Sequence, residues 1–143
     1  MLESKRYTDW RDIETNIALC INQFKSLRFD TILGLARGGM IPATLMSYKL
    51  RCNNLQQLGT RDVDTIQYYG TPILTGRVLV VDDINDSGLT FSSVDNYIRY
   101  HFDHDEIDEV TYCSMYRRYN TNFKTDITGE LVKDDAWLVF PWD

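Results

Sequence analysis

The chain has 143 residues, a net charge of −6 and a sequence pI of about 4.8. Its 43% apolar and 25% charged residues are typical of a single globular domain with its own core. The acidic balance argues against non-specific binding to nucleic acid or to an anionic membrane surface. No apolar run reaches the roughly 18 residues of a membrane span, and the charged first residues are unlike a signal peptide. The cysteines are few and scattered, which favours a reducing compartment, and we expect the cytoplasm.

The first part of the chain alternates helical and strand patterns. Apolar residues recur at helical spacing over Asp9–Leu27, and either Thr8 or Asp9 is the expected N-cap. Asp30–Leu35 is a short apolar run that predicts a buried strand. A proline in the first turn suits a helix over Ile41–Arg51.

The same alternation continues to the C-terminus. We expect a weak strand at Asn54–Gly59, and then an exposed loop or mobile hairpin over residues 61–75. The strongest strand is Arg77–Val81, and Thr90–Phe102 has one apolar helical face. Further strands are expected at Asp108–Met115 and Ala136–Phe140. Strands that alternate with helices predict an α/β fold with a mostly parallel sheet, which binds ligands beyond the carboxyl ends of its strands.

One stretch, VLVVDDINDSGLT at Val78–Thr90, carries an unusual set of polar groups. Asp82 and Asp83 are adjacent carboxylates at the end of a buried strand, where they repel each other and resist desolvation. A ligand with paired hydroxyls, or a divalent cation, would relieve that conflict. The next residues are Asp86, Ser87, Gly88, Leu89 and Thr90, which lead into a helix. A glycine that permits close approach, outward amides and hydroxyl donors at a positive helix end suit a phosphate. The stretch therefore predicts a ribose 5-phosphate site.

Other phosphate and metal motifs fit this stretch less well. A Walker loop requires a lysine after Gly88, and the dinucleotide fingerprint has a different glycine spacing. An EF-hand that starts at Asp83 has Val94 where the bidentate glutamate belongs. A phosphate-accepting receiver domain is too long, because only 60 of the 143 residues follow Asp83. A plain Asp-Ser-Gly turn would account for part of the string but not for all of it.

VLVVDDINDSGLT resembles the signature of the type I phosphoribosyltransferases, which bind 5-phosphoribosyl-1-pyrophosphate (PRPP). The resemblance implies the fold of that family over residues 1–143, with Mg²⁺ as cofactor. Asp82 and Asp83 would bind the ribose hydroxyls and Mg²⁺, directly or through water. Asp86 lies where this family places a carboxylate against purine N7, so Asp86 is the candidate general base.

A second motif, LGLARGGMIPA, resembles the pyrophosphate loop of the same family. Alone it would be taken for a glycine turn with Arg37 as a solvated side chain. Its distance from the acidic stretch and the shared sheet edge favour the functional interpretation. The expected pyrophosphate-binding residues are Ala36, Arg37, Gly38 and Gly39. In this family the loop also adopts an unusual peptide geometry.

The C-terminal DAWLVFPWD is similar to the hood of the short xanthine-guanine phosphoribosyltransferases. The resemblance implies that Trp137 stacks on the purine and that the backbone of Leu138 reads its edge. The alternative is an aromatic edge strand. Residues 1–10 and 130–143 would form the hood, and residues 61–75 would close over the site as a lid.

The chain departs from the purine enzymes where they usually carry a lysine that donates to the 6-oxo group. Met115–Arg118 occupies that region, and Arg117 is the candidate substitute. We expect transfer of phosphoribosyl from PRPP to hypoxanthine, guanine or xanthine, by a homodimer or homotetramer without nucleic acid or membrane partners. Two alternatives stay open at this point: another base such as a pyrimidine or orotate, and a PRPP-sensing regulator without catalysis.

Overall fold

The computed structural model describes residues 4–62, 66–69, 71–103 and 105–143. Along the chain the elements are β1 (Lys5–Tyr7), α1 (Trp10–Gln23), β2 (Thr31–Ala36), α2 (Met40–Leu50), β3 (Leu55–Asp62), β4 (Ile66–Tyr69), β5 (Gly76–Asn85), α3 (Leu89–His101), β6 (Ile107–Arg118), β7 (Ile127–Val132) and β8 (Trp137–Val139). Within these ranges, none of the helices combines the length and the apolar character needed to cross a bilayer.

The main sheet has six strands in the order β4-β3-β2-β5-β6-β7. Every neighbouring pair is parallel except β3 and β4, which form an antiparallel hairpin. β5 lies inside the sheet, between β2 and β6, and its residues Val78–Val81 are fully buried. The predicted α/β fold with a mostly parallel sheet is confirmed.

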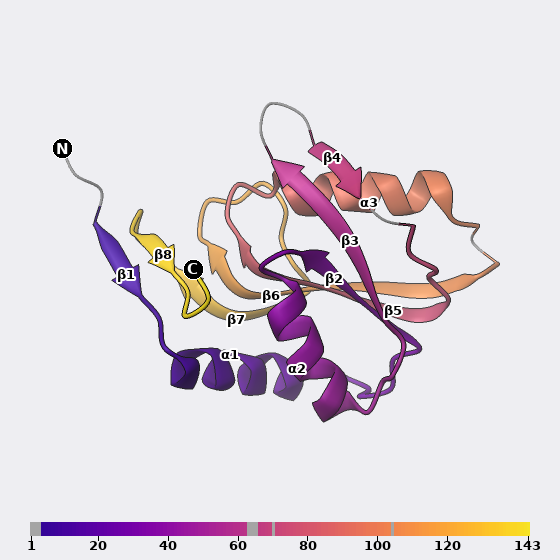
Figure 1. The fold of residues 1–143 in the computed structure, drawn as a ribbon, viewed down its shortest axis with the longest axis horizontal. Coiled ribbons are helices and arrows are strands. Elements are labelled where there is room, and N and C mark those ends of the chain that lie inside the picture. The colour runs from indigo at the N-terminus through magenta and orange to yellow at the C-terminus, as the bar shows by residue number, and fades with distance from the viewer. Residues whose placement is uncertain (1–3, 63–65, 70, 104) are drawn as a thin grey trace.

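The helices cover both faces of this sheet (Figure 1). α1 and α2 pack on one face with Leu79 and Val81, whereas α3 packs on the other with Val78 and Val80. Successive residues of a strand point to opposite faces. A parallel strand covered on both sides is therefore apolar at every position, which explains the unbroken apolar run before Asp82.

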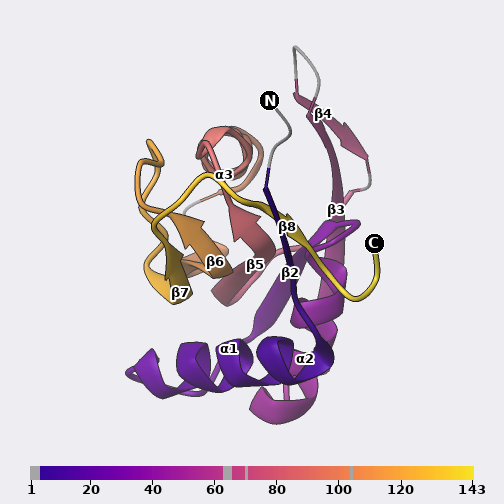
Figure 2. The ribbon, with the colours of Figure 1, turned by 90° about the vertical axis from the view of Figure 1, so that its left-hand side faces the viewer.

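A second, two-stranded sheet lies beside the main one. β1 and β8 lie side by side in Figure 2. They pair in parallel, with Lys5 opposite Trp137 and Tyr7 opposite Val139. Both segments were expected to contribute to a hood, although residues 130–132 belong to β7 of the main sheet instead. The pairing brings the two ends of the chain together at the carboxyl edge of the main sheet.

The predicted helix at Asp9–Leu27 is shorter in the structure. Asp9 is its N-cap: its carboxylate accepts a hydrogen bond from the amide of Asp12 at 2.9 Å, and the amide of Asp9 donates to the carboxylate of Asp12 at 3.0 Å. The helix ends at Gln23, because Phe24 takes an extended conformation and packs its ring edge against Phe29 at 5.2 Å. The helical spacing that continues to Leu27 is therefore not followed by the backbone after Gln23.

The predicted strands are present in the structure, but some of them end at different residues, and two further strands occur. β5 and β6 run beyond their predicted ends, to Asn85 and Arg118. Part of the segment at residues 61–75 forms the hairpin of β3 and β4, whereas residues 63–65 and 70 lie outside the described residues. β1 and β7 were not predicted, since both are short and carry polar residues.

Candidate functional site

The two motifs meet at the carboxyl edge of β2 and β5. These strands are parallel neighbours, with Gly34 opposite Val81, so the loops that follow them lie side by side. A Cβ atom on Gly39 would lie 2.9 Å from the carboxylate of Asp82 and 2.7 Å from the carbonyl oxygen of Val81. A Cβ atom on Gly38 would overlap the carboxylate of Asp83. Both glycines are therefore required for the close approach of the loop to the acidic pair.

The loop itself is a tight turn. The peptide bond between Ala36 and Arg37 is cis, and the amide of Gly39 donates to the carbonyl oxygen of Leu35 at 2.9 Å. Met40 then begins α2, with its amide bonded to the carbonyl of Arg37. Arg37 is exposed, so its guanidinium could contribute positive charge to an anion at this edge.

The acidic pair is half-buried at the end of β5. Burial raises the pKa of the Asp82 carboxyl well above its usual range, and the charge of Asp83 raises it further. Burial also raises the pKa of Asp83. The Asp82 carboxylate accepts a hydrogen bond from the amide of Asp83 at 2.8 Å, and the Asp83 carboxylate accepts one from the amide of Ile84 at 2.7 Å. The structure thus confirms the electrostatic conflict that the sequence predicted.

This pair could hold a divalent cation only with help from a ligand. The described residues contain no group of three or more histidine, cysteine, aspartate and glutamate side chains with metal-binding geometry. Mg²⁺ is commonly bound by one or two carboxylates together with phosphate oxygens of the substrate. Asp82 and Asp83 fit that mode, because a cation beside them would favour their charged forms.

The turn after β5 exposes the amino end of α3. Gly88 is the N-cap and has a φ of 93°, a conformation that glycine adopts without strain. No side chain of the described residues caps the helix at Gly88, although the hydroxyl of Ser87 accepts from the amide of Leu89 at 3.2 Å. The helix therefore presents amide donors and a positive dipole end to this turn, as an anion site requires.

A loop from a distant part of the sequence braces the turn, and sequence reasoning missed it. The amide of Asn122 donates to the carbonyl oxygen of Ser87 at 3.1 Å, and the side chain of Asn85 bonds both Phe123 and Thr121. A Cβ atom on Gly88 would lie 2.6 Å from the amide nitrogen of Phe123. The turn therefore has a rigid backing and a free outer side.

Two cavities of about 190 Å³ each adjoin at this edge. The first, the phosphate cavity, is lined by Asp82, Asp83, Ile84, Asn85, Asp86, Ser87, Gly88, Thr90 and Phe91. The second, the hood cavity, is lined by Asp83, Ile84, Asp86, Arg118, Trp137, Leu138, Phe140 and Asp143. Three residues, Asp83, Ile84 and Asp86, line both. A ligand could therefore extend from one cavity into the other past the Asp86 carboxylate.

The structure brings most of the predicted residues together but exchanges one arginine for another. Arg118, rather than the predicted Arg117, lines the hood cavity. The reason is strand register: Asn85, the last residue of β5, pairs with Arg117 of β6. The residues that follow these two, Asp86 and Arg118, therefore lie beside each other. The Nε of Arg118 donates to the Asp86 carboxylate at 3.1 Å. Alternation along β6 predicts opposite directions for the two arginines, but only the register says which one meets Asp86.

The hood cavity is lined by the two predicted residues Trp137 and Leu138 and by Asp143, which the sequence did not single out. Trp137 is 55% exposed and Leu138 only 5%, in agreement with one ring that faces a ligand and one side chain that anchors the strand. Asp143 lines the same cavity, and its carboxylate accepts from the amide of Phe140 at 2.9 Å.

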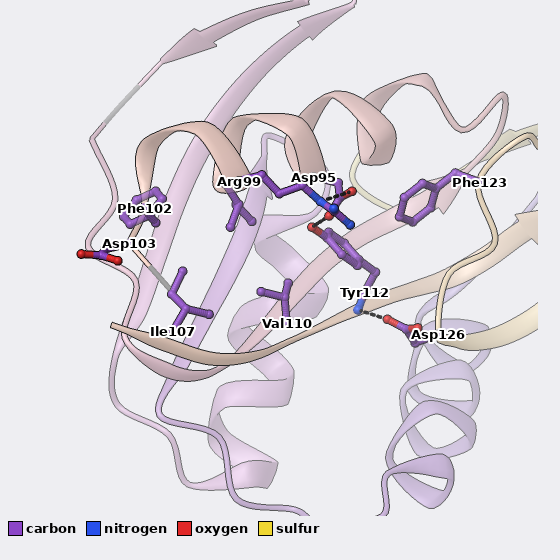
Figure 3. A pocket seen from close by; sticks show the side chains of 10 residues that line it. Asp95, Arg99, Phe102, Asp103, Ile107, Val110, Tyr112, Phe123 and Asp126 are labelled. Atoms are coloured by element: carbon purple, nitrogen blue, oxygen red, sulfur yellow. Dashed lines mark hydrogen bonds and ion pairs between the residues drawn. The ribbon is translucent and has the colours of Figure 1, made fainter. Parts of the chain in front are cut away.

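A larger groove of about 520 Å³ lies away from both motifs, between α3 and β6 (Figure 3). Its polar groups bond one another: the hydroxyl of Tyr112 and the guanidinium of Arg99 both donate to Asp95, and Asp126 accepts from the amide of Tyr112. None of the residues from Asp82 to Thr90 lines it. We therefore place the candidate site at the paired cavities and not in this groove.

No protein-family model matches the chain. The chain is 23% identical over 140 residues to the xanthine-guanine phosphoribosyltransferase of Chromohalobacter salexigens, which covers 94% of this chain and 81% of the relative. Among solved structures, the purine phosphoribosyltransferase from Pyrococcus horikoshii Ot3 superimposes with a TM-score of 0.85 at 24% identity, over 98% of this chain and 94% of that one. The chain has the type I phosphoribosyltransferase fold.

A further solved structure agrees with this fold. The xanthine-guanine-hypoxanthine phosphoribosyltransferase of Helicobacter pylori superimposes with a TM-score of 0.79 at 17% identity, over 96% of this chain and 94% of that one. The resemblance found in VLVVDDINDSGLT is therefore confirmed, and the similarity to the prokaryotic purine enzymes extends over nearly the whole chain.

Proposed function

We propose that the protein is a purine phosphoribosyltransferase. It transfers the 5-phosphoribosyl group of PRPP to a 6-oxopurine (hypoxanthine, guanine or xanthine) and releases pyrophosphate. The proposal agrees with the activity for which the relatives of similar sequence and structure are named. The main support for this proposal is that the two cavities adjoin at Asp86. One cavity is lined by the turn from Asp86 to Thr90, and the other by the exposed Trp137.

PRPP would lie across the edge of β5. Its 5′-phosphate takes the amides of the turn from Ser87 to Thr90, and its ribose hydroxyls take the carboxylates of Asp82 and Asp83. The pyrophosphate lies against the loop of Ala36, Arg37, Gly38 and Gly39, which approaches the same carboxylates. The 5′-phosphate, the ribose and the pyrophosphate of PRPP would thus match, in that order, the turn after β5, the acidic pair and the loop after β2.

The base would lie in the hood cavity, with the ring of Trp137 against its face and the Leu138 backbone at its edge. A bond forms between a purine ring nitrogen and C1 of the ribose, while the bond from C1 to the pyrophosphate oxygen breaks and pyrophosphate leaves with the electron pair. Asp86 accepts the proton that the purine loses at N7. The Asp86 carboxylate lines both cavities, so it would receive this proton where the base meets the ribose.

Asp82 and Asp83 would hold Mg²⁺ together with oxygens of PRPP. When bound, Mg²⁺ neutralises negative charge that grows on the leaving pyrophosphate. Residues 61–75 are proposed to exclude water from the activated sugar as a lid, because hydrolysis of PRPP is the wasteful side reaction.

The proposal is tested by incubation of the protein with PRPP and Mg²⁺ and with one base at a time: hypoxanthine, guanine, xanthine, adenine, orotate or uracil. Chromatography of the products should show a mononucleotide with at least one 6-oxopurine, and none after chelation of Mg²⁺ by EDTA. Turnover of orotate or uracil alone would replace the purine assignment with a pyrimidine one. PRPP binding by calorimetry without turnover of any base would indicate a PRPP sensor.

We also propose a cytoplasmic location and a homodimer or homotetramer. The described cysteines, Cys20, Cys52 and Cys113, are all buried and free, in keeping with a reducing compartment. Light scattering of the purified chain would measure the assembly, and a monomeric mass would contradict it.

A further inference from the structure

Arg118 makes an unusual set of bonds at the last position of β6. Its Nε donates to the Asp86 carboxylate at 3.1 Å. Its Nη1 donates to the carbonyl oxygen of Asp134 at 3.0 Å, and its Nη2 donates to that of Ala136. One guanidinium therefore connects the acidic turn after β5 with the segment that enters β8.

The two partners of the ion pair differ in how firmly they are held. The side chain of Arg118 is 8% exposed, whereas that of Asp86 is 58% exposed. Arg118 has two backbone acceptors besides Asp86, and a guanidinium stays charged at every accessible pH. Asp86 lies in an exposed turn and bonds no other side chain that the structure describes. The arginine is thus the fixed partner, and the aspartate takes its position from it.

The two backbone acceptors place the hood strand as well. Asp134 and Ala136 lie in the short connection between β7 and β8, directly before Trp137. Ala136 is itself buried, and its amide bonds the side chain of Asp134 at 3.0 Å. Arg118 therefore contacts the connection at two carbonyl groups, and the next residue, Trp137, pairs with Lys5.

We propose that Arg118 is a positioning residue that sets the Asp86 carboxylate and the Trp137 strand in register with each other. The inference rests on the proposed function. It assigns a role to a residue that lies outside both VLVVDDINDSGLT and LGLARGGMIPA. The base is bound by the hood and loses its proton to Asp86, so both events depend on one guanidinium. An error of about 1 Å in such a constellation lowers rates by about 100-fold.

The test measures kcat and KM for the base and for PRPP in Arg118→Met. We expect kcat to fall by about 100-fold and the KM for the base to rise, with the KM for PRPP within about twofold of the wild type. Arg99→Met is the matched control, because Arg99 also pairs with an aspartate, Asp95, but in the groove of Figure 3. The control should retain wild-type kinetics. Equal losses for both substrates in Arg118→Met would overturn the proposal.

A double-mutant cycle with Asp86→Asn separates positioning from general loss of structure. If Arg118 acts through Asp86, adding Arg118→Met to Asp86→Asn should lower kcat by less than about threefold further. A full further loss of about 100-fold would contradict action through Asp86. Arg118→Lys keeps the charge but lacks the planar fork, and it also serves if the Met variant does not fold. We expect a loss of at least about tenfold in kcat for Arg118→Lys, and wild-type kcat would overturn the geometric role.

The tie to the hood is measured without turnover. Hydrogen exchange of the amides at residues 133–139 should become at least about tenfold faster in Arg118→Met and stay unchanged in Arg99→Met. Unchanged exchange in Arg118→Met would overturn the tie. If the wild-type protein forms no nucleotide with any base, the proposed function fails, and the exchange result still decides whether Arg118 holds this segment.

Discussion

Gly38 and Asp83 leave no room between them for a methyl group: a Cβ atom on Gly38 would overlap the Asp83 carboxylate. Gly38 follows β2 and Asp83 lies near the end of the neighbouring strand β5, so the two residues belong to motifs that are well separated in the sequence. Backbone amides of the loop and carboxylates of the turn therefore face the same small volume. A pyrophosphate that binds the first group lies within reach of a cation held by the second.

Gly38→Ala should weaken PRPP binding without unfolding the protein. The new methyl group displaces the end of the Asp83 side chain and not a backbone segment. The substitution should therefore disturb the PRPP site more than the stability of the fold. We expect the Kd of PRPP in calorimetry to rise at least about tenfold, equivalent to about 1.4 kcal/mol. Gly129→Ala is the contrasting control, since its Cβ would meet the backbone carbonyl of Met115. That variant should lower Tm and keep PRPP affinity, and the reverse pattern would refute the proposed contact.

Asp82→Asn should stabilise the protein in the absence of Mg²⁺ and PRPP at neutral pH. Because the folded-state pKa of Asp82 is raised above its unfolded value of about 3.9, its contribution to stability is complete below that value. The contribution is lost as the pH rises through the folded-state pKa. Asparagine has no proton to lose, so its Tm should exceed that of the wild type by a few degrees at pH 7.

The pH dependence is the control for this prediction. The difference in Tm between Asp82→Asn and the wild type should shrink as the pH falls towards about 3.9, where both side chains are neutral. Calorimetric scans at several pH values measure it. A difference that is constant with pH would mean that packing, and not the charge of Asp82, separates the two proteins.

Asp86→Asn should lower kcat by about 10² to 10⁴, the usual contribution of a general base. The amide keeps the size of the side chain and can still accept from Arg118, so the fold and PRPP binding should persist. Asp95→Asn removes an aspartate from a comparable arginine pair outside the site and should keep wild-type turnover. Wild-type turnover in Asp86→Asn would exclude the assignment of Asp86 as the base.

Trp137→Ala should raise the KM for the purine far more than that for PRPP. Stacking of a base on an aromatic ring contributes about 1–3 kcal/mol, so the expected rise in KM is about five- to 150-fold. Trp10→Ala removes a tryptophan of similar exposure, 52% against 55%, that does not line the hood cavity. Steady-state kinetics with each substrate varied in turn make the comparison. Equal increases in both KM values would argue against stacking.

The contiguous motifs could be predicted from the sequence, because their chemistry is local. The buried strand before Asp82, the turn from Asp86 to Thr90 and the start of α3 are all fixed by neighbours in the chain: apolar residues on both faces, a glycine N-cap and a helical period. The loop at Gly38 and Gly39 was found for the same reason. These features hold in the structure at the positions expected, and with them the α/β fold class.

Other features depend on contacts between distant segments, which a single sequence does not contain. The short β1 and β7 exist only because each has a neighbouring strand. The register between β5 and β6 sets Arg118, and not Arg117, beside Asp86. A shift of one residue in that register would exchange the two arginines, since alternate residues of a strand face opposite ways. The sequence by itself thus determined the phosphate turn and the acidic pair, whereas tertiary pairing alone decided which side chains complete the hood cavity.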